Sequence, residues 1–431
     1  MSMEIDLPDG WQLKNIHQIV SKEGIFIDGD WIESKDQDQN GEVRLIQLAD
    51  LGDGVFKNKS SRFLTLKRAH ELNCTFLREG DILVARMPDP IGRACIFPLK
   101  GDSKFVTAVD VGIIRPESDD INVKFLSYLI NSPKKRNEIE ALQSGTTRKR
   151  ISRKNLGTIL FPIPPVTEQH QIVEKIEELF SELDKGIENL KMAQQQLKIY
   201  RQAVLKWAFE GKLTNENVKD GELPGGWETK NLKQIAAKIT DGEHATPKRT
   251  NQGALLLSAR NIHNGYLKLE NVDYIPTDEY ERIIKRCHPE PGDILISCSG
   301  SVGRVCLVPP NLKFTMVRSV ALLKLNWNLF CPKFFEYQLQ SSTLQKQIEK
   351  GKKATAQANL FIGPIGNLQV VICSLKQQIK IVEEIESRLS VCDKMEETIT
   401  NSLQQAEALR QSILKRAFEG KLVENKCYET A

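Results

Sequence analysis

The sequence predicts an α+β protein: two β-rich globular domains separated by two long antiparallel helices that form a coiled coil, with a pseudo-twofold internal repeat. Three observations support this prediction. The chain repeats itself, each repeat closes with a long segment of helical periodicity, and each repeat opens with short runs rich in β-branched residues. A chain of 431 residues is also too long for a single hydrophobic core.

The internal repeat is clearest in the helical segments. At a constant shift of about 209 residues, roughly 22 of about 49 aligned positions from Pro165 onward are identical, without a gap. Shorter motifs recur in the same order: Leu-Pro-x-Gly-Trp at 7–11 and 223–227, Gly-Asp-Ile-Leu at 80–83 and 292–295, and Ala-Phe-Glu-Gly-Lys-Leu at 208–213 and 417–422. The chain is therefore a tandem duplication whose helical parts stayed similar while its globular parts diverged.

The globular parts contain short apolar runs bounded by Gly, Pro or Asp, which are typical of strands. In the first half these runs predict strands at 26–31, 43–48, 81–86, 94–97 and 111–114, and helices are predicted at 124–131 and 136–143. The whole chain is predicted to have five parts: globular domains at 1–163 and 215–373, helical segments at 164–214 and 374–423, and a tail at 424–431.

The two helical segments have the spacing of a coiled coil. Between residues 168 and 209 there is no Pro, and apolar residues recur every three or four positions. Ser374 with Gln377 makes a capping-box pattern at the start of the second helix, and Gly211 and Gly420 are suited to end the helices. Each helix would be on the order of 65 Å long. A helix of this length with one apolar stripe needs a partner, and the other copy is the obvious one.

Two similar domains at a fixed separation suit the recognition of a split DNA site. Equivalent major-groove faces recur every helical turn, about 34–36 Å. Two readers held apart would therefore contact two half-sites and leave the base pairs between them unread. Because the two globular domains have diverged, the two half-sites would differ in sequence. The alternative is a coiled-coil scaffold that joins proteins and has no role in DNA recognition.

The order of these motifs resembles the specificity subunit of type I restriction-modification systems, over essentially the whole chain. The residues that carry the resemblance are the Leu-Pro-x-Gly-Trp openings, the Gly-Asp-Ile-Leu motifs, the closing Phe-Glu-Gly-Lys-Leu, and Phe-Pro-Ile-Pro-Pro at 161–165 followed by Glu168-Gln169. One departure is that Val-Ile-Cys-Ser-Leu at 371–375 replaces Phe-Pro-Ile-Pro-Pro in the second copy.

The resemblance implies a division of labour within a larger complex. Each globular domain would be a target recognition domain that reads one half of a bipartite site on double-stranded DNA. The helices would set the spacer and dock modification subunits, most naturally two, which carry the methyltransferase chemistry. A separate restriction subunit, an ATP-dependent nuclease and translocase, would join them. S-adenosylmethionine, ATP and Mg²⁺ are therefore expected on the partner subunits, and no cofactor on this chain.

The sequence lacks the motifs of an enzyme. It contains no Gly-x-x-x-x-Gly-Lys-Ser/Thr phosphate loop and no Asn/Asp-Pro-Pro-aromatic methyltransferase motif, and its six histidines have no metal-ligand spacing. We therefore expect no catalytic residue and no metal ligand. A self-sufficient nuclease or methyltransferase is the third hypothesis. The start of the chain lacks a secretory signal, no apolar run is long enough to span a bilayer, and the nine cysteines form no C-x-x-C pair. These features predict a cytoplasmic protein without membrane contact.

Candidate DNA-binding residues are the basic and amide side chains of three segments. A net charge of +4 does not by itself indicate nucleic-acid binding, so local clusters carry the prediction. The first domain offers Arg148, Lys149, Arg150, Arg153 and Lys154, and the second offers Lys248, Arg249, Lys350, Lys352, Lys353, Gln357 and Asn359. Cations would neutralise phosphates, while Gln and Asn could pair with adenine edges. The competing interpretation for each is a solvated surface loop.

Two further groups have less specific interpretations. Trp207, Phe209 and Phe418 lie at the helix ends and are predicted to contact the modification subunits, but packing of the helix ends explains them equally well. Arg93 and Arg304 recur in both halves. Because readers of different half-sites should differ, recurrence favours a structural role for these two arginines.

Overall fold

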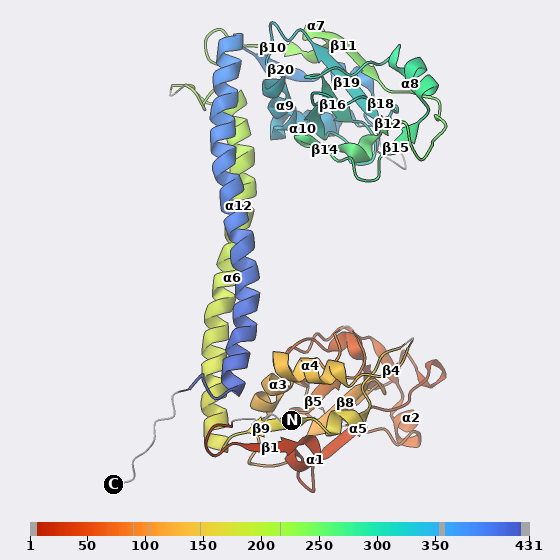
Figure 1. The fold of residues 1–431 in the computed structure, drawn as a ribbon, viewed down its shortest axis with the longest axis vertical. Coiled ribbons are helices and arrows are strands. Elements are labelled where there is room, and N and C mark those ends of the chain that lie inside the picture. Colours follow the sequence, from red (N-terminus) through yellow and green to blue (C-terminus); the bar gives the residue numbers. More distant parts are fainter. Residues whose placement is uncertain are drawn as a thin grey trace. The chain divides into compact units, whose positions relative to one another are not determined.

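The computed structural model describes residues 7–88, 90–101, 103–146, 148–215, 217–352 and 358–423. The chain divides into two compact units (Figure 1): residues up to Leu190 and from Asn401 onward form unit 1, and Lys191–Thr400 form unit 2. Each unit holds one β-rich globular domain and part of both long helices. The predicted fold class, with two β-rich domains and two long helices in a duplicated chain, is confirmed.

The globular domain of unit 1 contains three sheets. A four-stranded antiparallel sheet has the order β2 (Ile25–Asp28), β8 (Val111–Arg115), β5 (Ile82–Ala85) and β6 (Ala94–Ile96). A three-stranded sheet has the order β4 (Arg62–Leu64), β3 (Val43–Ile46) and β7 (Phe105–Thr107), with β3 and β7 parallel. β1 (Gln12–Asn15) pairs with β9 (Leu160–Ile163). The helices are α1 (Ile16–Ile19), α2 (Leu66–Glu71), α3 (Val123–Ile130), α4 (Pro133–Ala141) and α5 (Arg153–Gly157).

Unit 2 repeats these three sheets and adds a two-stranded sheet. Its four-stranded sheet is β11 (Ala236–Asp241), β19 (Val320–Leu325), β16 (Ile294–Ser297) and β17 (Val305–Leu307), and its three-stranded sheet is β15 (Asp273–Ile275), β12 (Ala254–Leu257) and β18 (Phe314–Met316). β10 (Glu228–Asn231) pairs with β20 (Gln369–Ile372), and β13 (Ile262–His263) with β14 (Tyr266–Leu267). The helices are α7 (Leu232–Ile235), α8 (Thr277–Ile284), α9 (Pro332–Gln340), α10 (Ser342–Gly351) and α11 (Ile362–Gly366).

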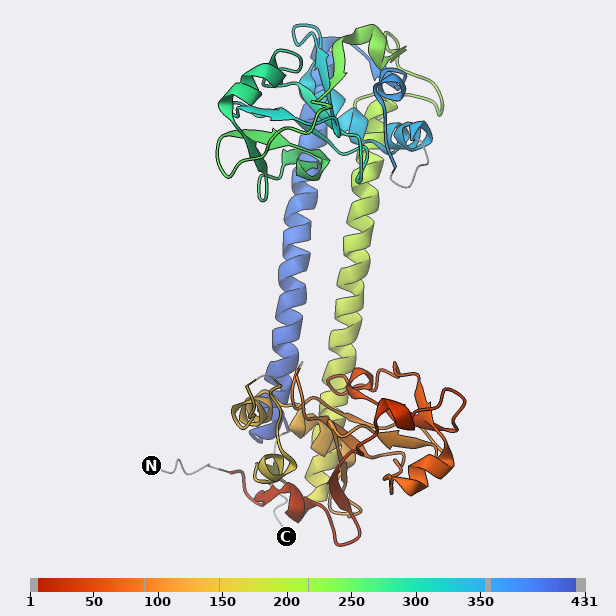
Figure 2. The same cartoon turned by 90° about the vertical axis from the view of Figure 1, so that its right-hand side faces the viewer.

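The long helices α6 (Val166–Phe209) and α12 (Leu375–Phe418) pack against each other in both units (Figure 2). In unit 1 the guanidinium of Arg410 lies 4.4 Å from the ring centre of Phe180 and also pairs with Asp184. In unit 2 Arg201 bonds Asp393 at 2.6 Å and Glu396 at 3.1 Å. Since residue numbers rise along one helix as they fall along the other in these pairs, the helices are antiparallel, as predicted.

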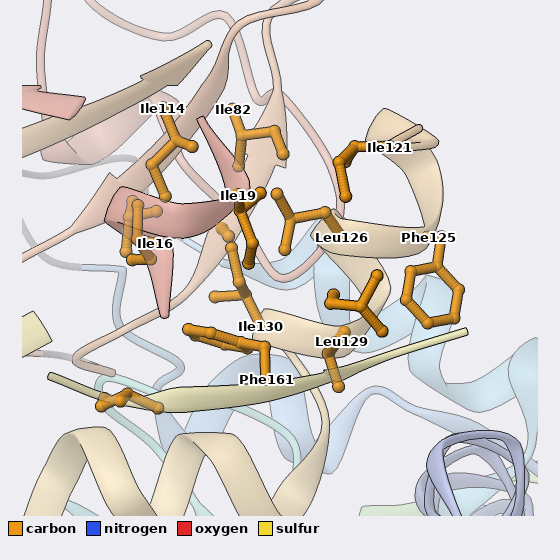
Figure 3. Packing of buried hydrophobic residues seen from close by; sticks show 14 of the residues in the cluster. Ile16, Ile19, Ile82, Ile114, Ile121, Phe125, Leu126, Leu129, Ile130 and Phe161 are labelled. Atoms are coloured by element: carbon orange, nitrogen blue, oxygen red, sulfur yellow. The ribbon is translucent and has the colours of Figure 1, made fainter. Parts of the chain in front are cut away.

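The core of each unit joins its globular domain to both helices. In unit 1, Ile16 and Ile19 of α1 face Leu126 and Ile130 of α3, above Phe161 of β9 (Figure 3). The same cluster continues into Ile172 and Ile176 of α6 and into Ile413 and Ala417 of α12. The corresponding cluster of unit 2 contains Val204 and Ala208 of α6 and Ile381 and Ile385 of α12. The apolar stripe of each helix is therefore buried mainly near the globular domains.

The motif that opens each repeat packs against the motif that closes the other repeat, which explains why both recur. A Cβ placed on Gly420 would lie 2.3 Å from Cγ of Pro8, and one on Gly211 would lie 2.2 Å from Cγ of Pro224. Both glycines have positive φ angles, 68° and 78°, which end the helices. Only glycine satisfies both the backbone conformation and the close approach.

A buried glutamine fixes the start of each long helix. The Gln169 amide accepts from the backbone N–H of Asn122 at 2.8 Å and donates to the carbonyl of Pro164 at 2.9 Å. Gln378 accepts from the N–H of Cys331 at 2.8 Å and donates to the carbonyl of Cys373 at 2.8 Å. The altered sequence before the second helix therefore leaves its start unchanged. The predicted pairing of Ser374 with Gln377 is confirmed by bonds of 3.3 and 3.4 Å.

Replacing the fully buried Gln378 by leucine should lower the free energy of unfolding of the chain by about 3 kcal/mol, because two partly buried backbone groups lose their hydrogen-bond partner. Urea unfolding followed by circular dichroism measures this loss. The matched control is Gln195→Leu, at an exposed position on α6, which should change stability by no more than about 0.5 kcal/mol. Equal effects of the two substitutions would contradict the role given to Gln378.

Candidate nucleic-acid interface

The five cations predicted for the first domain lie together in one segment of unit 1, the basic loop, defined as residues 144–154. Arg148, Lys149, Arg153 and Lys154 are exposed, and Arg150 is half-buried. Among the described carboxylates none forms an ion pair with these five side chains. The loop therefore presents a cluster of uncompensated positive charge to solvent, as an anionic polymer requires.

Backbone and side-chain hydrogen bonds give the basic loop a defined shape at its ends. The N–H and carbonyl groups of Ser144 and Arg150 bond reciprocally at 2.9 Å, which closes the tip of the loop. The amide of Asn155 in α5 donates to the carbonyl of Leu142, which follows α4, at 3.1 Å. The described ends of the loop are thus bonded to each other, and the side of the loop that enters α5 is bonded to the residue that follows α4.

The first turn of α5 carries two basic residues, although acidic residues are the ones that stabilise the start of a helix. Ser152 caps this helix by accepting from the N–H of Asn155, and Arg153 and Lys154 follow directly. Positive side chains at a helix N-terminus are opposed by the helix dipole, at a cost of tenths of a kcal/mol up to about 1 kcal/mol. Their placement brings no stability, which favours a role in binding an anion.

The candidates of the second domain have different surroundings. Lys248 and Lys350 are exposed, but Arg249 bonds Asp273 at 2.8 Å, where Arg260 also pairs at 2.7 Å. Lys352 pairs with Glu349, and Asn359 forms a backbone bridge with Ser299. Lys353 and Gln357 lie outside the described residues. Among the described candidates of this domain, Arg249 and Lys352 are thus paired with carboxylates, unlike the five cations of the basic loop.

Sequence reasoning missed an acid-Gly-acid triplet that ends an edge strand of both four-stranded sheets: Asp28-Gly29-Asp30 after β2 and Asp241-Gly242-Glu243 after β11. The two glycines pack on backbone carbonyls, 2.2 and 2.1 Å from an added Cβ. In unit 1, Asp28 pairs with Arg86. In unit 2, the triplet holds two half-exposed arginines of the α8 region, through Asp241–Arg286 at 3.0 Å and Glu243–Arg282 at 3.4 Å. The signal in the sequence was the recurrence of the triplet.

The aromatic residues at the helix ends pack inside their own units. The ring of Phe209 lies edge-on to Phe334 at 5.2 Å, and Phe418 lies edge-on to Phe125 at 5.4 Å. Phe209 is only 7% exposed, so packing of the helix end accounts for it and little of its ring is left for a partner. Trp207 differs, since it is 39% exposed and its ring lies edge-on to Tyr200.

Arg93 has the structural role that its recurrence predicted. Its guanidinium is buried and donates to the carbonyls of Leu51, Pro90 and Leu48 at 2.8–2.9 Å. Within the described ranges, no group of three or more His, Cys, Asp or Glu side chains could hold a metal ion. In the same part of the chain, no helix is both long enough and apolar enough to cross a membrane.

Comparison with known proteins gives a consistent result across the chain. The family model described as Type I restriction modification DNA specificity domain matches residues 8–192 and, a second time, residues 224–405. The chain is 28% identical over 323 residues to the specificity subunit of the type I restriction enzyme EcoBI of Escherichia coli, covering 72% of this chain and 68% of that protein. The EcoKI specificity subunit of Escherichia coli strain K12 is 27% identical over 327 residues, with the same coverage.

Solved structures show the same fold. A chain from a structure on complex assembly and conformational transition of the type I R-M system aligns with a TM-score of 0.72 at 18% identity, covering 96% of this chain and 99% of that chain. The HsdS subunit from Thermoanaerobacter tengcongensis aligns with a TM-score of 0.58 at 17% identity, covering 96% and 98%.

The acid-Gly-acid triplet of unit 1 predicts a dependence of stability on pH. Burial raises the pKa of Asp30 to about 6 from 3.8, against the lowering effect of the hydrogen bond from the Thr75 N–H. Above pH 4 the unfolded chain ionises this carboxyl while the folded chain resists ionisation. The folded state therefore loses stability as the pH rises to about 6, and Asp30→Asn removes that loss.

Asp30→Asn should accordingly be more stable than the native chain by about 1 kcal/mol at pH 7.5 and nearly equal to it at pH 4, since solvent screens a half-buried carboxyl. Urea unfolding at both pH values measures the difference. Asp119→Asn, at an exposed position, is the control and should show no such trend. An advantage of Asp30→Asn that shrinks as the pH rises would refute this account.

Proposed function

The chain belongs to the family of type I restriction-modification DNA specificity domains, of which it carries two copies, and we propose that these copies recognise the two different halves of a bipartite site on double-stranded DNA. The resemblance noted from the sequence motifs is thereby confirmed, and the chain is a specificity subunit in its fold and family. The observation that carries the proposal is that one framework holds two different sets of surface residues.

The framework repeats at the level of single hydrogen bonds. The N–H of Ile151, at the base of the basic loop, donates to the carbonyl of Arg86 at 3.0 Å, and the N–H of Leu360 donates to the carbonyl of Cys298 at 2.8 Å. The side chains presented around this shared bond differ between the units. A backbone framework that is repeated in both units, with surface residues that differ, is what recognition of an asymmetric site requires, since base contacts must differ where the two half-sites differ.

In unit 1 the basic loop would supply the DNA contacts. Arg148, Lys149 and Arg150 would contact phosphates or guanine edges from the loop tip, and Arg153 and Lys154 would add phosphate contacts from the start of α5. In unit 2 the proposed contacts are Lys248, Arg249, Lys350, Lys352, Lys353, Gln357 and Asn359. The Arg249–Asp273 pair would fix the guanidinium and leave its other N–H groups for DNA.

The long helices would dock the modification subunits. The part of the helix pair in unit 2 carries an apolar groove of about 600 Å³, lined by side chains that include Leu197, Tyr200, Val391 and Met395. Val391 and Met395 are each 52% exposed, which is unusual for a solvated helix surface. Trp207 is a further candidate for this contact.

The chemistry would belong to partner subunits. We propose that this chain is non-catalytic and acts in the cytoplasm with two modification subunits, which bind S-adenosylmethionine, and with a restriction subunit, which uses ATP and Mg²⁺. The chain alone would then transfer no methyl group to DNA, whereas the assembled complex would. A scaffold without a DNA role would instead give a complex whose methylation has no bipartite sequence preference.

Exchanging residues 225–370 for the corresponding domain of another family member should change one half of the recognised site and leave the other half intact. The spacer should also stay the same, because both helices are retained. Sequencing of methylated positions in cells that carry the hybrid with its modification subunits gives the bipartite motif directly. A change in both halves would contradict independent recognition by the two domains.

Arg148→Ala with Lys149→Ala should weaken DNA binding by the complex with its modification subunits. If both side chains contact phosphates, the slope of log affinity against log salt should fall by about 2. Fluorescence anisotropy with a labelled duplex at several salt concentrations measures both quantities. The matched control is Lys14→Ala with Lys22→Ala, two lysines of unit 1 outside the basic loop, which should leave the slope unchanged.

A further inference from the structure

Arg86 is a buried cation that underlies the basic loop of unit 1. It directly follows strand β5 and is 2% exposed. Neither the sequence motifs nor the family resemblance gives this residue a role. A buried arginine costs free energy unless its N–H groups are satisfied, so its partners indicate what it is for.

The side chain of Arg86 joins the loop to two strands of the four-stranded sheet. Its Nε donates to the carbonyl of Ile151 at 3.1 Å, inside the basic loop. Its Nη1 donates to the carbonyl of Val109, just before β8, at 3.1 Å and pairs with Asp28 at the end of β2. One rigid guanidinium thus fixes the base of the loop to the sheet at three points.

Unit 2 has no arginine at the position of Arg86, although it keeps the backbone hydrogen bond formed there. The equivalent position, defined by the hydrogen bond from the N–H of Leu360, is Cys298, whose side chain cannot reach across to the loop. The carboxylate equivalent to Asp28 is Asp241, which instead pairs with Arg286 and His244. The side-chain tether of Arg86 is therefore not needed by the fold, because unit 2 adopts the same fold without it.

The tether also brings two like charges close together. Burial lowers the pKa of Arg86, and the nearby guanidinium of Arg150 lowers it further, while Asp28 and Asp110 raise it. Holding Arg150 near a buried cation is electrostatically unfavourable until an anion approaches. A loop selected for stability alone would avoid this arrangement.

We propose that Arg86 is a positioning residue for DNA recognition by unit 1: it holds the basic loop in the geometry that lets the loop cations contact specific bases. It does not touch DNA itself. The inference rests on the proposed function and deepens it by assigning the loop's orientation to one side chain. Because base discrimination needs fixed geometry whereas phosphate contacts tolerate mobile side chains, the two properties should separate when Arg86 is removed.

The test uses the complex of the full chain with its modification subunits. Arg86→Met with Asp28→Asn removes the tether, keeps the net charge and leaves no unpaired buried carboxylate. Cys298→Ala is the matched control in unit 2. Arg148→Ala with Lys149→Ala is the comparison that removes contacts instead of positioning. Affinity is measured by fluorescence anisotropy for a duplex that carries the bipartite motif found by sequencing methylated positions. The same measurement is made for duplexes with one substituted base pair in either half, at a series of salt concentrations.

We expect the tether variant to lose most of the discrimination against substitutions in the first half-site, up to about tenfold, out of the roughly 5- to 150-fold that one mismatch confers. Discrimination in the second half-site should be unchanged, and the salt slope should fall less than in the loop variant. Cys298→Ala should behave as the native chain in both halves. Arg86→Lys, which keeps the charge but lacks the planar guanidinium that spreads the donors over Nε and Nη1, should restore little of the discrimination.

Three outcomes would overturn the inference. Unchanged discrimination in the first half-site would show that the tether does not position the loop. Equal losses in both half-sites would indicate general destabilisation instead. A salt slope reduced as much as in the loop variant would make Arg86 a determinant of contact number and not of geometry. If the loop variant itself binds DNA normally, the proposed function of the basic loop fails, which is a separate result.

Discussion

The contact on which the rest of the structure depends is the packing of each helix end against the opening of a globular domain. Gly420 packs against the ring of Pro8 in unit 1, and Gly211 packs against the ring of Pro224 in unit 2. A helix of 44 residues with a narrow apolar stripe gains little from its partner helix alone, so its ends must be buried elsewhere. The globular domains provide that burial.

This constraint makes unit 1 a composite of both ends of the chain. Its globular domain comes from the first part of the sequence, while Ile413 and Ala417 in its core come from the last helix. Each globular domain therefore contacts the start of one helix and the end of the other. The motifs at these contacts must match in both copies, which explains why Ala-Phe-Glu-Gly-Lys-Leu is repeated without change while loop residues such as Arg148 are not.

The sequence predicted the parts of the fold that depend on local pattern. The repeat, both long helices and the strands around Gly-Asp-Ile-Leu follow from periodicity and turn residues. The pairing of β1 with β9 and the parallel pairing of β3 with β7 were not predicted, since each joins segments far apart in the chain. Local pattern carries no information about such partners.

For the candidate site, charge clustering identified the basic loop but not what holds it. Arg86 looks in the sequence like one more surface cation, and only its burial and its three partners distinguish it. Arg249 illustrates the opposite case: the sequence predicts it as a DNA-binding cation, and Asp273 in a distant strand compensates its charge. Phe209 and Phe418 remained ambiguous for the same reason, because the rings they pack against are more than a hundred residues away.

The two units thus present positive charge in different ways on one framework. The basic loop of unit 1 carries cations without described carboxylate partners, whereas Arg249, Arg260, Arg282 and Arg286 of unit 2 are each held by a carboxylate. An unpaired cation gains most from long-range attraction to phosphates and loses it as salt is added. A paired arginine gains less from that attraction but starts with its guanidinium already oriented, so its contribution lies in geometry. After the duplication the two units have therefore diverged in more than sequence. Unit 1 relies more on long-range attraction of unpaired cations to phosphates, and unit 2 relies more on arginines whose orientation is already set by a carboxylate.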